Sequence, residues 1–208
     1  MFTGIVQGMG TIVDIQKGND NKSQTNWVKL PQMSTEGLQV GASIANNGCC
    51  LTIAKVEKDV VAFNLIEETL KRTNLSSFVV GDRINIERSI KMGDEIGGHI
   101  MSGHIMRTLV ISKIEKSAEN CSIFFNLPEE VRPYIFEKGF IGLDGCSLTV
   151  GKINGSEFSV HLIPETLDLT IFKYRKIGDE VNLEIDSQTQ AIVNTVARFM
   201  RDQLILPL

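Results

Sequence analysis

Gly48-Cys49-Cys50-Leu51-Thr52 recurs 97 residues later as Gly145-Cys146-Ser147-Leu148-Thr149. The same offset relates Leu65-Ile66-Glu67-Glu68-Thr69-Leu70 to residues 162–167, and Gly81-Asp82-Arg83-Ile84-Asn85-Ile86-Glu87 to residues 178–184. Over residues 41–88, 16 of the 48 gapless pairs are identical, where ordinary residue usage would give about 3 by chance. A repeat this long exceeds a solenoid unit, so it predicts two tandem copies of one small domain.

Each copy is rich in short runs of strand-forming residues separated by turn signals. In the first copy these runs are Thr11–Ile15, Trp27–Leu30, Leu51–Val56 and Val60–Leu65. About six such strands fit into each copy, with no long helical period between them. Closing an antiparallel sheet on itself removes its exposed edges. We therefore expect an all-β chain of two tandem, similar, six-stranded antiparallel Greek-key barrels with short helices.

Two short helices are expected in each copy. One begins at the Leu-Pro pair, at Leu30-Pro31 and most clearly over residues 128–132, because proline suits a first helical turn. The other covers residues 67–72 and its counterpart 165–168. Gly97-Gly98 lets the chain turn between the barrels. The expected domains are residues 1–97, 98–186 and a C-terminal helix over 187–208.

The C-terminal segment has no counterpart in the first copy. Ser187-Gln188-Thr189-Gln190 resembles a capping box, and apolar residues follow at helical spacing: Ile192, Val193, Val196, Phe199 and Met200. An appended helix has no core of its own. Two roles stay open for it, self-association through the apolar stripe or packing on its own barrels.

Composition excludes several classes of function. A net charge of −4, one Trp and two Tyr give neither a basic field nor stacking platforms for nucleic acid. No apolar run approaches a membrane span, and no basic segment opens the N-terminus, so we expect a soluble cytoplasmic protein. The four cysteines lack metal-site spacing, and adjacent Cys49-Cys50 is poor disulfide geometry. Reduced thiols packed as small hydrophobes are expected, with no metal.

Polar residues at matching positions of the two copies are the candidates for chemistry. The pairs are Cys50 with Ser147, Thr52 with Thr149, Asn64 with His161, Glu68 with Glu165, and Thr69 with Thr166. Such side chains suit the edges of a flat polar heterocycle, although each residue alone also fits a structural role. Near the start of the copies, at an offset of 99, His104 stands where the first copy has Ile5. An imidazole in only one copy is a candidate for proton transfer or for a structural role.

These motifs resemble the riboflavin synthase family, alpha-chain type. The resemblance rests on residues 1–6, 47–52, 97–104, 142–149, 161–167 and 185–190. It implies a transferase that dismutates two molecules of 6,7-dimethyl-8-ribityllumazine into riboflavin and 5-amino-6-ribitylaminouracil, without metal or organic cofactor. It further implies a homotrimer whose active sites lie between the N-terminal barrel of one subunit and the C-terminal barrel of another. Each site would hold two lumazines. With a trimer implied, the apolar stripe makes the C-terminal helix over 187–208 the expected trimerisation element.

The resemblance also implies site residues. The N-barrel pocket is expected to use Gly4, Ile5, Val6, Cys50, Leu51, Thr52, Asn64, Leu65, Ile66, Glu67, Glu68 and Thr69. The C-barrel pocket is expected to use Gly103, His104, Ile105, Ser147, Leu148, Thr149, His161, Leu162, Ile163, Pro164, Glu165 and Thr166. Lys138 belongs to the binding set. The candidates for influence on the chemistry are Phe2, Ser43, Cys50, His104 and Asp186.

Two rival functions are considered. Non-catalytic relatives hold one lumazine or flavin as a fluorescent antenna, and their motifs typically degenerate in one half. Both Glu-Thr-Leu motifs and Ser102-Gly103-His104 are intact here, which favours the enzyme. A flavin-binding barrel of a reductase would need a nucleotide domain with a glycine-rich phosphate loop, and the sequence contains none.

Overall fold

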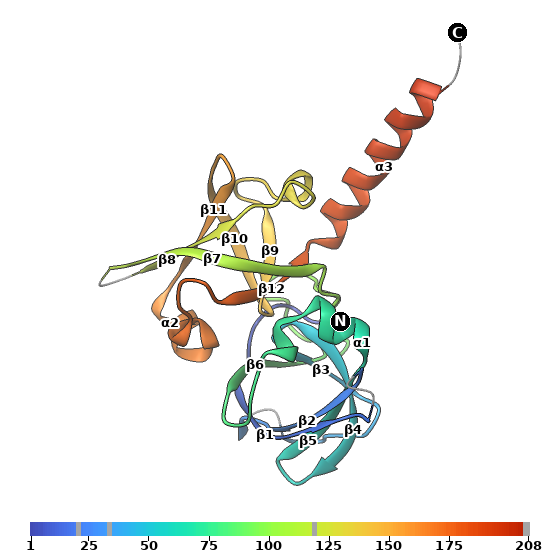
Figure 1. Cartoon of the computed structure of the whole chain (residues 1–208), viewed down its shortest axis with the longest axis vertical. Helices are drawn as coiled ribbons and strands as arrows, with labels where there is room; N and C mark the ends of the chain where they lie inside the picture. The colour runs from blue at the N-terminus through green and yellow to red at the C-terminus, as the bar shows by residue number, and fades with distance from the viewer. Residues whose placement is uncertain (20–21, 33–34, 118–119, 206–208) are drawn as a thin grey trace.

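The chain folds into two closed antiparallel barrels in series, followed by a helix (Figure 1). The computed structural model describes residues 1–19, 22–32, 35–117 and 120–205. The N-terminal barrel contains β1 (Gly8–Lys17), β2 (Gln24–Lys29), β3 (Ser43–Asn46), β4 (Cys49–Glu57), β5 (Val60–Leu65) and β6 (Arg83–Arg88). The C-terminal barrel contains β7 (Arg107–Lys116), β8 (Cys121–Asn126), β9 (Phe140–Leu143), β10 (Cys146–Asn154), β11 (Glu157–Leu162) and β12 (Glu180–Ile185). The predicted pair of six-stranded barrels is confirmed.

The strand order makes each barrel a Greek key. In the first barrel the order is β1-β2-β5-β4-β3-β6, so β3, β4 and β5 are consecutive neighbours and β2 pairs with β5. The second barrel repeats this order with β7 to β12. Each barrel has its own core: Ile12, Val28 and Phe63 are fully buried in one, and Ile111, Phe125 and Val160 in the other. Alternation along the strands directs these side chains inward.

One pair of short helices was predicted correctly from the sequence, and the other predicted pair was not confirmed. Helices α1 (Glu67–Arg72) and α2 (Pro164–Leu169) stand where they were predicted. The helix predicted over 128–132 was wrong, because that stretch forms turns that lead into the 3₁₀ helix η3 (Arg132–Tyr134). Pro133 disfavours the helical conformation of the residue before it, which explains the failure. The matching helix expected at Leu30-Pro31 runs into residues 33–34, outside the described residues.

The segments that precede the two barrels pair with each other. Phe2 and Met101 form an antiparallel bridge with N···O distances of 2.9 and 3.0 Å in the two directions. Their side chains pack together with Ala45 in a small buried cluster between the barrels. Beyond this bridge, Val6 packs into the core of the C-terminal barrel, while Ile105 packs against that of the N-terminal barrel. Each segment thus belongs to the core of the other half.

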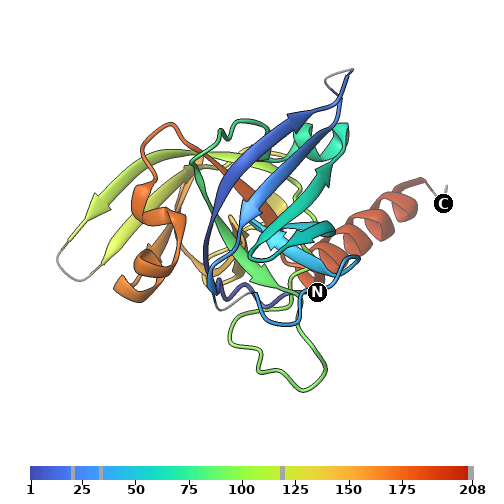
Figure 2. The same cartoon turned by 90° about the horizontal axis from the view of Figure 1, so that it is seen from below.

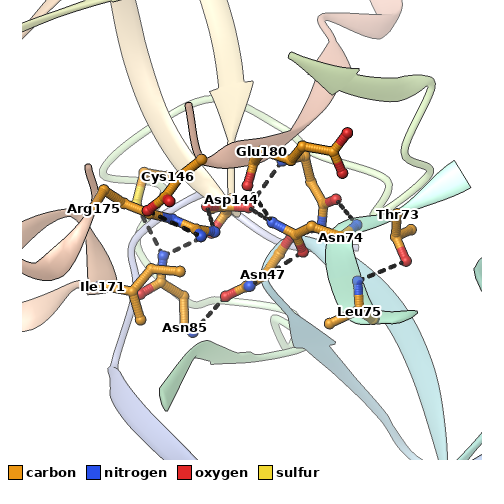
Figure 3. Close-up of polar contacts among 12 residues, drawn as sticks. Asn47, Thr73, Asn74, Leu75, Asn85, Asp144, Cys146, Ile171, Arg175 and Glu180 are labelled. Atoms are coloured by element: carbon orange, nitrogen blue, oxygen red, sulfur yellow. Dashed lines mark hydrogen bonds and ion pairs between the residues drawn. The ribbon is translucent and has the colours of Figure 1, made fainter. Parts of the chain in front are cut away.

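A buried network of polar side chains also joins the barrels (Figure 3). Asn85 Nδ2 donates to the Asp144 carbonyl at 2.8 Å, and its counterpart Asn182 Nδ2 donates to the Asn47 carbonyl at 2.9 Å. The carboxylate of Asp144, which is fully buried, accepts from Asn74 and pairs with Arg175 at 2.5 Å. Burial raises the pKa of Asp144, and Arg175 opposes that shift. Since buried polar groups need partners, this network fixes how the barrels meet.

Helix α3 (Ser187–Ile205) projects away from the C-terminal barrel (Figure 1). Near its base, Tyr134 Oη donates to Asn194 Oδ1 at 2.7 Å. The side chains of four apolar residues of this helix, Ile192, Val196, Phe199 and Met200, are more than half exposed. The segment between the barrels forms a separate exposed loop over residues 91–97 (Figure 2). Among the described residues, no helix is both long and apolar enough to cross a membrane.

Candidate active site

The N-terminal barrel carries a pocket of about 640 Å³. Cys50 at the start of β4 and the α1 residues Glu68 and Thr69 line one side of it, and the segment Gly103-His104-Ile105 lines the other. The Cys50 amide donates to the Gly103 carbonyl at 2.9 Å, which fastens this segment to the barrel. The wall thus combines a thiol, a carboxylate, a hydroxyl and an imidazole with an apolar side chain. Such a mixture suits a polar aromatic ligand.

The C-terminal barrel has an equivalent but smaller pocket of about 130 Å³. Ser147, Glu165 and Thr166 occupy the positions of Cys50, Glu68 and Thr69, and Gly4-Ile5-Val6 forms the facing wall. The Ser147 amide donates to the Gly4 carbonyl at 2.8 Å, matching the contact in the first barrel. The two pockets are therefore related by the repeat.

The expected assignment of residues to pockets was wrong for the two segments that open the copies of the repeat. Gly4, Ile5 and Val6 were assigned to the N-barrel pocket, and the structure places them on the C-terminal barrel. Gly103, His104 and Ile105 were assigned to the C-barrel pocket, and they line the N-terminal one. The cause is the reciprocal packing of Val6 and Ile105, by which each half of the chain completes the other half's pocket.

The glycine in each segment permits this close approach. Gly4 and Gly103 have φ values of +75° and +80°, which side chains rarely adopt. A Cβ on Gly4 would lie 2.5 Å from Ser147 Cβ, and one on Gly103 would lie 2.5 Å from Cys50 Cβ. Any larger residue would push the segment off the pocket residue that it contacts.

His99 lies next to the smaller pocket and is not among the site residues predicted from the sequence. Its Nδ1 is 2.7 Å from Ser147 Oγ, and its ring stacks on Phe140 with centroids 5.0 Å apart. Burial lowers the pKa of His99, while the carboxylate of Asp186 acts to raise it. The Nε2 atom is buried and has no hydrogen-bond partner among the described residues. A neutral imidazole here orients the Ser147 hydroxyl.

The candidates for chemistry fall into two groups. Cys50 and His104 line the larger pocket. Phe2 is buried in the bridge between the barrels, and Ser43 pairs in register with Thr52 on the neighbouring strand. Asp186 caps helix α3, accepting from the amide and hydroxyl of Thr189 at 2.8 and 2.7 Å. The capping box expected at Ser187 was therefore wrong, because Asp186 fills that role.

The remaining predicted binding residues flank the pockets. Three of these residues are buried in the barrel cores: Leu51, Leu65 and Leu162. Leu148 packs against the core of the C-terminal barrel. Asn64 accepts from Thr25, and His161 Nδ1 lies 2.8 Å from Ser122 Oγ. Asn64 and His161 are exposed, as are Thr52, Ile66, Thr149, Ile163, Pro164 and Lys138. Glu67 pairs with Lys71.

Several pocket residues were missed by the sequence. Thr73 lines the larger pocket and Thr170 the smaller one. Because they are an identical pair in the repeat, the sequence signal was present. Arg72 also lines the larger pocket, where its Nε donates to Glu68 at 2.7 Å. Its counterpart is Leu169, so the repeat gave no signal for it.

The fold and the paired pockets define a double-barrel protein with related concavities at equivalent positions of the two barrels, the one on the N-terminal barrel being the larger. The model of the lumazine binding domain matches residues 3–89 and 102–186. The chain is 50% identical over 201 residues to riboflavin synthase of Escherichia coli (strain K12), covering 96% of this chain and 93% of that protein. It is 39% identical over 204 residues to riboflavin synthase of Chlamydia muridarum, covering 98% and 99%. The chain belongs to the lumazine-binding family.

Solved structures show the same architecture. LumP complexed with riboflavin superposes with a TM-score of 0.83 at 25% identity, covering 90% of this chain and all of that one. LumP complexed with 6,7-dimethyl-8-(1'-D-ribityl) lumazine gives a TM-score of 0.81 at 24% identity, which supports the fold alone.

Proposed function

We propose that this protein is a riboflavin synthase, which converts two molecules of 6,7-dimethyl-8-ribityllumazine into riboflavin and 5-amino-6-ribitylaminouracil. The observation that carries the proposal is the pair of equivalent pockets, in which Cys50, Glu68 and Thr69 of one match Ser147, Glu165 and Thr166 of the other. Two copies of one substrate require two related binding sites. The identity to riboflavin synthases over nearly the whole chain supports the same reaction.

The reaction is a transfer of a four-carbon unit between two like molecules. The carbons that one lumazine loses are those that complete the third ring of riboflavin, so no external oxidant is needed. One lumazine gives up a proton from its 7-methyl group, and the other accepts a nucleophile at C7. Holding two reactants in alignment can lower a barrier by roughly 7–11 kcal/mol. Positioning is therefore the main task of the two pockets.

The pockets differ where the two lumazines need different chemistry. The larger pocket has His104, an exposed imidazole suited to moving the methyl proton, and Cys50 beside it. The smaller pocket has Ile5 and Ser147, with His99 2.7 Å from the serine hydroxyl. We assign proton transfer to His104 and positioning of a water or ring atom to Ser147.

We further propose a homotrimer whose active sites combine the N-barrel pocket of one subunit with the C-barrel pocket of the next. The exposed apolar side chains of α3, among them Ile192, Val196 and Phe199, support assembly through this helix. A helix that leaves its own barrels with this stripe uncovered is suited to packing against its copies.

Incubation of the full-length protein with the purified lumazine tests the proposed reaction. Riboflavin and the pyrimidine product are expected in equal amounts, with two lumazines consumed for each riboflavin. His104→Gln is the comparison variant. It leaves the barrel cores unchanged, and it should form riboflavin more slowly than the unmodified protein. Tight binding of lumazine without either product would refute the enzyme and leave a binding protein of the same family.

A further inference from the structure

The repeated segments 81–87 and 178–184 end in Glu87 on β6 and Glu184 on β12, two carboxylates that the proposed reaction does not use. Both are almost completely buried, with 4% and 3% of their surfaces exposed. Buried carboxylates occur where hydrogen bonds satisfy them. Their partners therefore show what they do.

Each carboxylate binds two consecutive backbone amides of one pocket-wall segment. Glu87 Oε1 accepts from the Thr3 amide at 2.7 Å and the Thr3 hydroxyl at 3.0 Å, and Oε2 accepts from the Gly4 amide at 3.1 Å. Glu184 Oε1 accepts from the Ser102 amide at 2.5 Å and its hydroxyl at 2.8 Å, and Oε2 accepts from the Gly103 amide at 3.0 Å. Charge-assisted hydrogen bonds of this kind are short and strong.

Each carboxylate and the pocket whose wall it holds lie on different barrels. Glu184 belongs to the C-terminal barrel, but the residues after Ser102-Gly103 form a wall of the N-barrel pocket, opposite Cys50. Glu87 belongs to the N-terminal barrel, but the residues after Thr3-Gly4 form a wall of the C-barrel pocket, opposite Ser147. The Ser102 hydroxyl also accepts from the His104 amide at 3.2 Å, so the Glu184 contacts extend to His104.

We propose that Glu87 and Glu184 are positioning residues that act across the barrel boundary, each fixing the wall of the ligand pocket on the opposite barrel. This inference rests on the proposed function in treating the two pockets as ligand half-sites. It deepens that function by assigning each half-site a determinant in the other half of the chain. Neither carboxylate lines the wall that it positions.

Protection of Cys50 from iodoacetamide by riboflavin, followed by peptide mass spectrometry on the full-length protein, tests this inference. Cys50 is the partly exposed cysteine of the larger pocket, whereas Cys49, Cys121 and Cys146 are buried. Glu184→Gln keeps the side-chain volume but removes the charge. The riboflavin concentration that gives half-protection should rise about tenfold, the equivalent of one charge-assisted hydrogen bond.

Glu87→Gln is the matched control, because it makes the same change in the other copy. It should leave half-protection of Cys50 within about twofold, as expected for separate sites. In a Cys50→Ser, Ser147→Cys background the reporter moves to the smaller pocket, and the two variants should exchange their effects. If Glu184→Gln does not fold, Ser102→Ala and Thr3→Val carry the same comparison, with smaller shifts in the same directions.

The outcomes distinguish a failure of the proposed ligand pocket from a failure of the positioning role alone. Absence of riboflavin protection in the unmodified protein would overturn the assignment of the pocket, and the positioning role with it. Protection in the unmodified protein, with equal effects of the two variants at Cys50, would overturn the positioning role alone. A larger effect of Glu87→Gln than of Glu184→Gln at Cys50 would also overturn it.

Discussion

The buried ion pair between Asp144 and Arg175 gives a quantitative test of how the barrels are held together. Asp144 is fully buried and the Arg175 side chain is 12% exposed, with Nη2 2.5 Å from Oδ2. Asp144→Asn keeps the shape of the side chain but removes the nearer counter-charge of the guanidinium, leaving only the more exposed Asp179 carboxylate 4.0 Å from Nη1. Breaking a buried pair in this way costs about 3–5 kcal/mol. We expect that loss in the free energy of unfolding.

The repeat supplies the control for this variant. Ninety-seven residues earlier the same positions are Asn47 and Phe78, an uncharged pair. Asn47 Oδ1 accepts from the Asn85 amide just as Asp144 Oδ1 accepts from the Asn182 amide, at 2.7 and 2.9 Å. The double variant Asp144→Asn, Arg175→Phe therefore copies an arrangement that the fold already accommodates. Its cost should be far below that of Asp144→Asn alone, because neutral replacement of a whole buried pair is often tolerated.

Thermal unfolding followed by far-ultraviolet circular dichroism measures both effects. For a chain of this size each kcal/mol lowers the midpoint by about 2–4 °C. A single variant within 1 °C of the unmodified protein would refute the reasoning, because the carboxylate would then carry no stability. A double variant as unstable as the single one would show instead that shape, and not the unpaired charge, sets the cost.

Three further predictions follow from the site and the tail. His104→Gln should lower turnover more than lumazine affinity, as measured by steady-state kinetics beside equilibrium binding, and unchanged turnover would remove His104 from the mechanism. Because burial lowers the pKa of His99 below its ordinary value of 6.5, the neutral form is favoured in the folded state. Stability should therefore fall as the pH drops below about 6.5, and His99→Gln should flatten that dependence; an unchanged pH profile would contradict it. Truncation after Ser187 should reduce the oligomer mass in light scattering, and full mass would exclude assembly through α3.

The sequence predicted what local patterns encode. Strands such as β4 and β5 follow from alternating apolar residues between turn signals, and the repeat doubled the signal for the barrel. It could not predict which barrel receives Gly4 or Gly103, because the repeat aligns each segment with its counterpart and is silent on packing. That choice is made by Val6 and Ile105, each of which contacts the opposite core.

Two residues make contacts in the structure that the sequence did not predict. Asp186, which the resemblance assigns to the chemistry, also caps α3, because its Oδ2 accepts from the amide and hydroxyl of Thr189. His99 is absent from the predicted site residues, because nothing in the sequence indicated its approach to Ser147, a residue 48 positions away. Long-range contacts of this kind depend on the tertiary fold, which local propensity does not determine.

The central claim is that one active site joins the N-barrel pocket of one chain to the C-barrel pocket of another, and mixed oligomers test it most directly. His104→Gln impairs the larger pocket and Glu165→Gln impairs the smaller one. When both variant chains are unfolded together and reassembled in equal amounts, random mixing in a cyclic trimer leaves about a quarter of the sites with two intact pockets. We predict riboflavin formation at about a quarter of the unmodified rate, well above either variant alone. Activity no higher than the mean of the two separate variants would contradict the account.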